Sequence, residues 1–249
     1  MSSSTTSLRR LSSDSVTGPA VLCFPHAAGC ASFFRPWRDL LPDARVHAVQ
    51  YPGREDRIAD AAPSGLAALA ESVAGEILRG EQRYSVLFGH SMGAYVAFEV
   101  AHRLRSAGVH VPSLIVSSAA APGLRSPVPF EDAGEVLAHL ERNEPLSEEI
   151  RQDEGLLDLI LGYAAQDLRL VAQYAQYPGK RIGSRLTAVV GEDDTPDMRN
   201  GFASWQDHTD GAFTPVVTAG GHFYLRTDPP LALIRAELGR SLVQSGGLV

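Results

Sequence analysis

The hydrophobic pattern alternates between short apolar runs and longer segments with apolar residues on one helical face. The clearest run is 84–88, which is typical of a buried strand, and similar runs occupy 20–24, 45–49, 113–118, 186–190 and 215–218. Helical periodicity begins at Ser32, Gly65, Met92, Met198 and Pro229. Strands that alternate with helices predict an α/β fold with a mainly parallel central sheet flanked by helices on both faces.

One connection is far longer than the others. The strand at 186–190 begins 67 positions after Ala119, whereas a parallel crossover needs little more than about a dozen residues. Segments 131–142 and 147–174 within it have helical periodicity and are separated at Pro145. We therefore expect a helical lid insertion at about 122–183, over the active edge of the sheet. A pair of packing helices is the alternative interpretation.

Composition indicates a single domain. The chain has 249 residues, which suits one α/β domain. Residues 1–17 are rich in Ser and Thr and are predicted to form a disordered tail, so the domain is expected to span 18–249. The net charge of −7, without a basic block, argues against a nucleic-acid partner.

Cysteine content and hydropathy indicate the compartment. Cys23 and Cys30 are too few for a disulfide framework and are expected to be free thiols. No apolar run approaches the ~20 residues needed to cross a membrane, and the N-terminus lacks the apolar core of a signal peptide. We expect a cytoplasmic protein without membrane contact.

The strongest chemical signal is Gly89-His90-Ser91-Met92-Gly93, which matches G-x-S-x-G between a strand and a helix. In so tight a turn the serine takes a strained backbone conformation, and side chains two residues to either side would collide, which explains the two glycines. The turn would hold the Ser91 hydroxyl at the carboxyl edge of the sheet. Ser91 is therefore the predicted nucleophile.

A serine nucleophile needs a base, and the base needs an acid that holds it in one tautomer. Of the eight histidines, His222 is the strongest base because it follows the last strand on a Gly-Gly loop. Asp194, just beyond the strand at 186–190, is favoured as the acid over its neighbour Asp193. The chain order Ser91, Asp194, His222 is that of an α/β-hydrolase.

Acyl transfer also requires donors for an oxyanion. The backbone N–H of Met92 is one predicted donor, and that of Ala27, in the loop after the first strand, is the other. No histidine lies at metal-ligand spacing from the carboxylates, so neither a metal nor a cofactor is expected.

Five motifs in order carry a resemblance to a known family. They are Phe24-Pro-His-Ala-Ala-Gly29, Gln50-Tyr-Pro-Gly-Arg-Glu55, Gly89-His-Ser-Met-Gly93, Gly191-Glu-Asp-Asp194 and Gly220-Gly-His-Phe223. Together they resemble the stand-alone type II thioesterases of polyketide and nonribosomal peptide pathways, relatives of the fatty-acid-synthase thioesterase. The resemblance implies an α/β-hydrolase with a helical lid that removes stalled or mis-primed acyl groups from the phosphopantetheine arm of an acyl or peptidyl carrier protein.

The family pattern places its triad on Ser91, Asp194 and His222, and its oxyanion amides on Met92 and Ala27. The chain departs from that pattern at Ala28, where a glycine is usual, and at Cys30, where a small polar residue is usual. The role of the turn at 52–55 stays open between structural ion pairing by Arg54 and phosphate binding.

Recognition of the carrier is a further expectation. Three basic residues near the expected mouth of the site, Arg54, Arg57 and Arg125, are predicted to meet an acidic carrier protein. Two rival functions remain beside the thioesterase: a carboxylesterase or acyltransferase with the same triad, and a catalytically silent binding module on a hydrolase scaffold.

Overall fold

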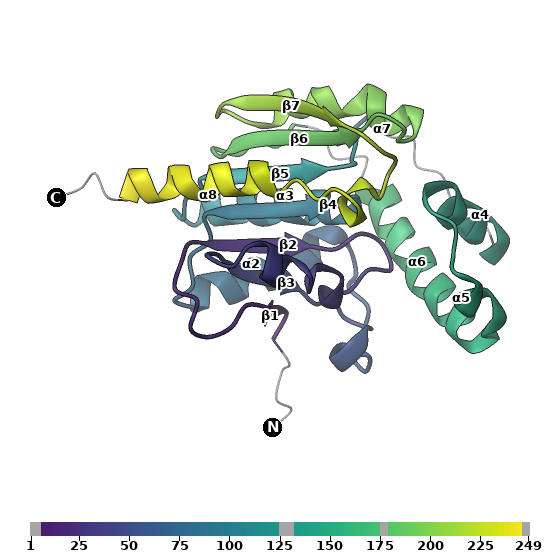
Figure 1. Cartoon of the computed structure of the whole chain (residues 1–249). Helices are drawn as coiled ribbons and strands as arrows, with labels where there is room; N and C mark the ends of the chain where they lie inside the picture. Colours follow the sequence, from purple (N-terminus) through teal and green to yellow (C-terminus); the bar gives the residue numbers. More distant parts are fainter. Residues whose placement is uncertain (1–5, 125–131, 175–178, 246–249) are drawn as a thin grey trace.

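A computed structural model describes residues 6–124, 132–174 and 179–245. Its centre is a seven-stranded sheet in the order β1-β3-β2-β4-β5-β6-β7 (Figure 1). Every neighbouring pair is parallel except β1 and β3, which are antiparallel. The strands are β1 (Leu8–Arg10), β2 (Ala20–Phe24), β3 (Arg45–Val49), β4 (Val86–His90), β5 (Ser113–Ser117), β6 (Arg185–Gly191) and β7 (Phe213–Thr218).

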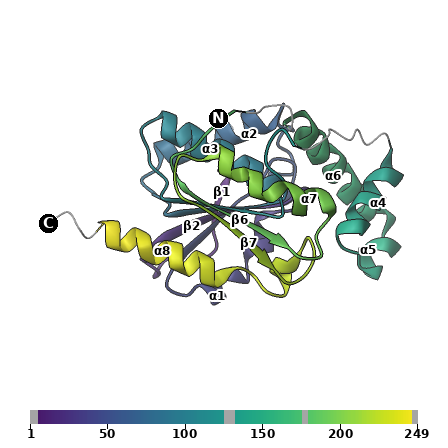
Figure 2. The same ribbon diagram turned by 90° about the horizontal axis from the view of Figure 1, so that it is seen from above.

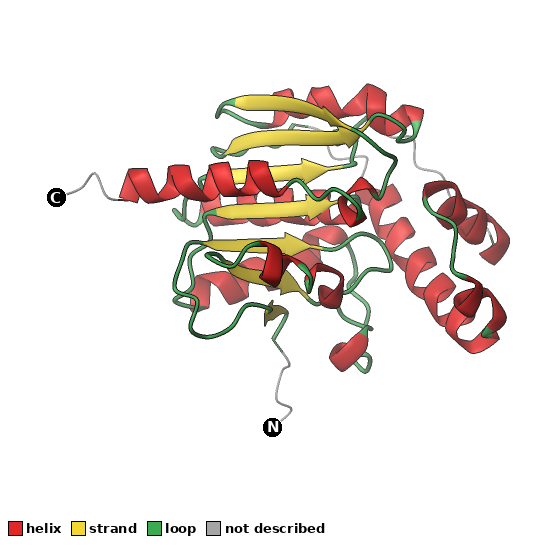
Figure 3. Cartoon of the chain, in the orientation of Figure 1, coloured by secondary structure: helices red, strands yellow, loops and turns green. Residues whose placement is uncertain are grey.

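Helices cover both faces of the sheet, as Figures 2 and 3 show. One core lies between the sheet and α2, α3 and the C-terminal part of α6, and the other lies between the sheet and η1, α1 and α8. The α-helices are α1 (Trp37–Leu40), α2 (Leu66–Arg79), α3 (Met92–Ser106), α4 (Ala133–Asn143), α5 (Glu148–Gln152), α6 (Glu154–Tyr174), α7 (Pro196–Gly201) and α8 (Leu231–Ser245). The 3₁₀ segments are η1 (Ala31–Phe34), η2 (Glu55–Arg57), η3 (Phe202–His208) and η4 (Tyr224–Arg226).

Two of the predicted helices are broken. The helix expected from Ser32 is two short pieces, η1 and α1, because Pro36 between them has no N–H to donate to a preceding carbonyl. The helix expected at 198–208 is a short α7 followed by η3. Both broken helices still bury large aromatic residues against the sheet: Phe34 in η1, Trp37 in α1 and Trp205 in η3.

The N-terminal segment differs from its prediction. Part of the tail expected to be disordered at 1–17 forms β1, which pairs with β3 in the register Leu8↔Val49. The Ser7 N–H donates to both carboxylate oxygens of Glu76 on α2, at 2.7 and 2.8 Å. Backbone pairing with an open sheet edge needs no apolar side chains, so the polar composition did not reveal this strand. Residues 1–5 lie outside the described residues.

The long insertion forms α4, α5 and α6, which extend beyond the carboxyl ends of the strands (Figure 1). The N-terminal and middle turns of α6 pack against α4 through Val136, Leu161, Ala164 and Leu168, and this cluster also contacts the loop after β2. The C-terminal turn of α6 joins the main core. The helix thus connects the body of the domain to the expected lid. The ends of the predicted lid region, including 125–131 and 175–178, lie partly outside the described residues.

A buried charge fastens the base of the insertion to the domain. Glu99 on α3 is fully buried, and its carboxylate accepts hydrogen bonds from Tyr174 Oη at 2.9 Å, from Lys180 Nζ at 2.5 Å and from Arg103. Burial raises the pKa of Glu99, but these donors outweigh it and bring the pKa below its ordinary value. The ionised carboxylate therefore ties the C-terminal end of the insertion, at Tyr174 and Lys180, to α3.

Helix length and composition also bear on membranes. The helix α6 has 21 residues, but none of the helices in the described ranges is both long and apolar enough to span a bilayer.

Candidate active site

Ser91 occupies the turn between β4 and α3. Its backbone has φ 54° and ψ −119°, a region that residues with a side chain rarely adopt. Its N–H donates to the Ser117 carbonyl at 2.8 Å, which holds the turn against β5. A Cβ on Gly89 would lie 2.2 Å from the Gly93 carbonyl oxygen, and one on Gly93 would lie 2.0 Å from that of Phe24. The two glycines thus permit a turn that presents Ser91 at the carboxyl edge of the sheet.

This packing gives a stability prediction. Gly93→Ala is expected to destabilise the fold by about 3 kcal/mol, the upper end of the usual cost of overpacking, because the added Cβ meets the backbone of β2 rather than a movable side chain. In an open helical position the same change stabilises by up to about 1 kcal/mol. Gly162→Ala on α6, where nothing lies within 4 Å of the added Cβ, is the matched control. Thermal or urea unfolding measures both, and equal stability of the two variants would contradict the tight turn.

His222 and Asp194 meet because the loops after β6 and β7 are packed on each other. The Asp193 N–H donates to the Gly220 carbonyl at 2.9 Å, and a Cβ on Gly191 would lie 2.3 Å from that same oxygen. His222 Nδ1 lies 3.0 Å from Asp194 Oδ1 and 3.3 Å from Oδ2. Since an ionised carboxylate only accepts, Nδ1 carries the proton and Nε2 is left as the basic nitrogen.

The surroundings of Asp194 keep it ionised. Burial raises its pKa, but the hydrogen bond from His222 and further nearby donors outweigh that effect and hold the pKa below the ordinary value of an aspartate. The Thr195 N–H also donates to Oδ1 at 2.7 Å. Asp193 and Glu192 are exposed. Of the neighbouring carboxylates weighed from the sequence, Asp194 is therefore the one brought to His222.

The two predicted oxyanion donors flank the same edge. The amides of Met92 and Ala27 donate no hydrogen bond to any other residue in the described part of the chain. By contrast, the adjacent amides of the loop after β2 are engaged, since Ala28 N–H donates to Asp167 Oδ2 at 2.7 Å and Gly29 N–H to the His26 carbonyl at 2.9 Å. An elbow serine, a His–Asp pair and two unengaged amides form an arrangement suited to acyl transfer.

Residues 19–237 of this chain match the sequence profile of a known family, the thioesterase domain. The chain belongs to the thioesterase family. It is 34% identical over 238 residues to the probable cadicidin biosynthesis thioesterase of Streptomyces griseus, covering 94% of this chain and 65% of that protein. It is 38% identical over 211 residues to the thioesterase PikA5 of Streptomyces venezuelae, covering 82% and 75% of the two chains.

A solved structure shows the same relationship. The type II thioesterase BorB from the borrelidin biosynthetic cluster matches this thioesterase with a TM-score of 0.81 and 36% identity, covering 93% of this chain and 97% of the other. The predicted α/β-hydrolase fold and the resemblance to type II thioesterases are thereby confirmed. The chain spans about two thirds of the length of the cadicidin protein.

Two further histidines of the thioesterase lie near the candidate triad, His90 in ring contact with His222 and His26 in ring contact with His90. The His90 ring centroid lies 5.2 Å from that of His222, and its Nδ1 lies 3.0 Å from Ser117 Oγ, which in turn contacts Tyr224 Oη at 2.8 Å. Burial and the nearby His222 lower the pKa of His90 well below its ordinary value. Burial, followed by Arg226, lowers the pKa of His26 to about 3.

Both rings are therefore neutral at physiological pH and do not repel a protonated His222. From the sequence, His90 was interpreted only as the variable residue of the elbow, and Ser117 and Tyr224 were not singled out at all. No local motif connects His90 with Ser117 and Tyr224, because the three residues come from separate elements.

Arg54 answers one open question and corrects one prediction. It is buried and forms an ion pair with Asp167 on α6, which favours the structural role over phosphate binding. The expectation that Arg54 meets an acidic carrier protein is wrong, because its side chain is only 4% exposed. Arg57 is bound to Asp60 at 2.7 Å and to the Gln50 carbonyl at 2.9 Å. Arg125 lies outside the described residues.

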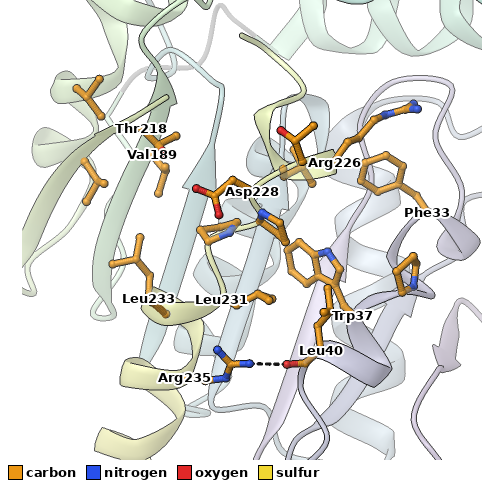
Figure 4. Close-up of a pocket in the computed structure, with 18 residues that line it drawn as sticks. Phe33, Trp37, Leu40, Val189, Thr218, Arg226, Asp228, Leu231, Leu233 and Arg235 are labelled. Carbon is orange, nitrogen blue, oxygen red and sulfur yellow. Dashed lines mark hydrogen bonds between the residues drawn. The ribbon is translucent and has the colours of Figure 1, made fainter. Parts of the chain in front are cut away.

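A separate cavity of about 790 Å³ lies beside β6, β7 and the start of α8 (Figure 4). Its lining does not include the candidate triad, but Phe33 and Arg226 belong both to it and to the aromatic group around His26. Arg226 lies over the Phe33 and Phe223 rings, at 5.4 and 5.3 Å, and pairs with Glu144 between α4 and α5 at 3.1 Å. The rim of the site is thus connected to the lid. The dashed line in Figure 4 joins Arg235 to the Leu40 carbonyl, at 2.6 Å.

A metal centre is not found in the described part of the chain. Among residues 6–124, 132–174 and 179–245, no three His, Cys, Asp or Glu side chains are placed to hold a metal ion. Cys23 is buried and Cys30 lies 3.0 Å from Ser32 Oγ, and both are free thiols.

Proposed function

We propose that this chain is a type II thioesterase that hydrolyses acyl thioesters on the phosphopantetheine arm of acyl or peptidyl carrier proteins. In this role it would clear stalled or mis-primed acyl groups in polyketide or nonribosomal peptide biosynthesis. The observation that carries the proposal is the strained Ser91 elbow at the same sheet edge as the His222–Asp194 pair. The names of its relatives, thioesterases of biosynthetic clusters, support the substrate class.

The first half of the proposed reaction forms an acyl-enzyme. His222 Nε2 takes the proton of Ser91 Oγ as that oxygen attacks the thioester carbonyl. The N–H groups of Met92 and Ala27 stabilise the oxyanion, and the start of α3 adds its positive dipole end. The C–S bond then breaks, and His222 returns the proton to the departing pantetheine sulfur.

The second half releases the acid. Water enters the space left by the thiol, and His222 Nε2 removes one of its protons as the oxygen attacks the Ser91 ester. The same amides stabilise the second oxyanion. When the ester bond breaks, His222 gives the proton back to Ser91 Oγ. Asp194 holds the imidazole in one tautomer through both steps, and no cofactor takes part.

The insertion would bind the acyl chain. Its apolar cluster of Val136, Leu161, Ala164 and Leu168 packs onto Ala27 and Ala28, beside the proposed oxyanion hole. An acyl chain attached to Ser91 is shielded from solvent when it lies beneath such an apolar surface. We therefore assign α4, α5 and α6 as the lid over the acyl chain.

Two other functions can be separated from this one by experiment. A carboxylesterase or an acyltransferase would use the same triad, and comparison of matched thioester and oxygen-ester substrates, with water or an alcohol as acceptor, distinguishes them. A silent binding module would leave Ser91 unreactive. Labelling of Ser91 by a fluorophosphonate probe, found by peptide mass spectrometry, contradicts that alternative.

Carrier recognition gives a prediction of its own. We expect kcat/KM for an acyl-carrier protein to exceed that for the matching acyl-CoA by at least about tenfold, which equals roughly 1.4 kcal/mol of extra binding in the transition state. A carrier adds protein contacts around the mouth of the site, and the adenosine of CoA does not replace them. Steady-state assays with one acyl group on both donors measure the ratio. Equal values would remove the carrier from the proposal and leave a general thioesterase.

A further inference from the structure

Asp167 joins three segments that are distant in the sequence. It lies on the lid helix α6 and is only 3% exposed. One carboxylate oxygen, Oδ2, accepts the Ala28 N–H at 2.7 Å and also receives the Arg54 guanidinium. A buried carboxylate in the lid therefore contacts both the loop after β2 and the turn after β3.

The loop that Asp167 contacts is held in an unfavourable conformation. Ala28 has φ 60°, in the left-handed region where the Cβ of an L-residue is crowded by its own backbone. Further bonds hold the loop on both sides of Ala28, since the Tyr51 hydroxyl donates to the Pro25 carbonyl at 3.0 Å and the Ala31 N–H donates to Gln50 Oε1 at 2.9 Å. The bond to Asp167 is the one that acts on the strained residue itself.

Arg54 supplies the charge that this arrangement needs. Burial raises the pKa of Asp167 above its ordinary value, and the positive charge of Arg54 limits that rise. Arg54 is itself kept in place, because Gln50 Nε2 donates to its carbonyl at 3.2 Å and the Tyr51 and Tyr163 rings lie 5.3 and 5.6 Å from its guanidinium. The pair is thus built into the interface between lid and domain.

We propose that Asp167 is a positioning residue for the oxyanion hole. By accepting the Ala28 N–H, its carboxylate fixes the peptide that joins Ala27 to Ala28. This holds Ala27 in place, so that its own N–H is directed to the oxyanion formed at Ser91. Because Asp167 belongs to α6, the lid and the oxyanion hole are set in place together. This inference rests on the proposed function, and it deepens that function by adding a residue which does not touch the substrate.

The first test separates transition-state effects from binding. Asp167→Asn is expected to lower kcat about 10- to 100-fold with less than a threefold change in KM, since an oxyanion donor acts only in the transition state. Affinity for an alkylboronic acid, which forms a tetrahedral adduct on the serine, should fall by a similar factor. Asp158→Asn, an exposed position on the same helix, is the matched control and should change neither quantity.

The second test is rescue through the strained residue. A glycine at position 28 adopts a positive φ without crowding, so Ala28→Gly removes the need for the restraint. Added to Asp167→Asn, it should restore kcat at least about fivefold relative to Asp167→Asn alone. A merely structural role for Asp167 predicts a recovery of stability without this recovery of kcat.

A third variant separates an effect on the oxyanion hole from a loss of folding in Asp167→Asn. Asp167→Glu keeps the charge beside Arg54 but displaces the acceptor from Ala28, and it should lower kcat and boronate affinity together while the protein stays folded at the assay temperature, as thermal unfolding shows. Unchanged boronate affinity in the folded Asp167 variants would overturn the inference. If Ser91→Ala is inactive in the same assays, the proposed function still holds. If Ser91→Ala is active instead, the proposed function fails and this inference fails with it.

Discussion

Ser91→Ala will lower kcat by about 10⁶-fold, as removal of the nucleophile does in other serine triads. Without Oγ no acyl-enzyme forms, and only the oxyanion donors and substrate binding remain to accelerate attack by water. The fold should be unchanged, because alanine and serine bear the same Cβ at φ 54° and Gly89 and Gly93 still allow the turn. Hydrolysis of an acyl-carrier protein, followed by mass spectrometry of the carrier, measures the loss.

Two controls make this result specific. The variant should unfold at the temperature of the parent protein, and a fluorophosphonate probe should label the parent but not the variant. A variant that keeps a tenth of the parent activity would show that another residue is the nucleophile.

Asp194→Asn is expected to lower kcat by about 10⁴-fold. The asparagine can donate its amide hydrogen to Nδ1 of His222, which favours the tautomer with the proton on Nε2. That nitrogen then cannot accept the Ser91 proton. Asp194 is buried, and its Oδ1 lies 3.0 Å from His222 Nδ1, so water cannot readily replace the lost carboxylate. The assay is the one used for Ser91→Ala.

The neighbouring residue provides the matched control. Asp193 is exposed, and its backbone rather than its side chain contacts the loop of His222. Asp193→Asn should therefore change kcat by less than about threefold. The reverse ranking of the two variants would transfer the role of the acid to Asp193.

The architecture was largely predictable because its signals are local. The buried strands are continuous apolar runs, and the turn at 89–93 requires glycine at two positions whatever the rest of the chain does. The strand β1 was missed for the opposite reason. Its stability comes from backbone pairing with β3 and from the Glu76 carboxylate, neither of which can be inferred from the composition of residues 8–10.

The elbow, the strand ends that bear Asp194 and His222, and the helical insertion could be predicted because each depends on residues adjacent in the chain. The sequence favoured Asp194 over Asp193, but the contact that distinguishes them is visible only in the folded chain, since it depends on which side chain faces a loop 28 residues away. Contact between Asp167 and Ala28 spans 139 residues. The role of Asp167 could not be predicted from the sequence, because the desolvation cost of the buried carboxylate is offset by a cation and an N–H donor from other elements of the fold.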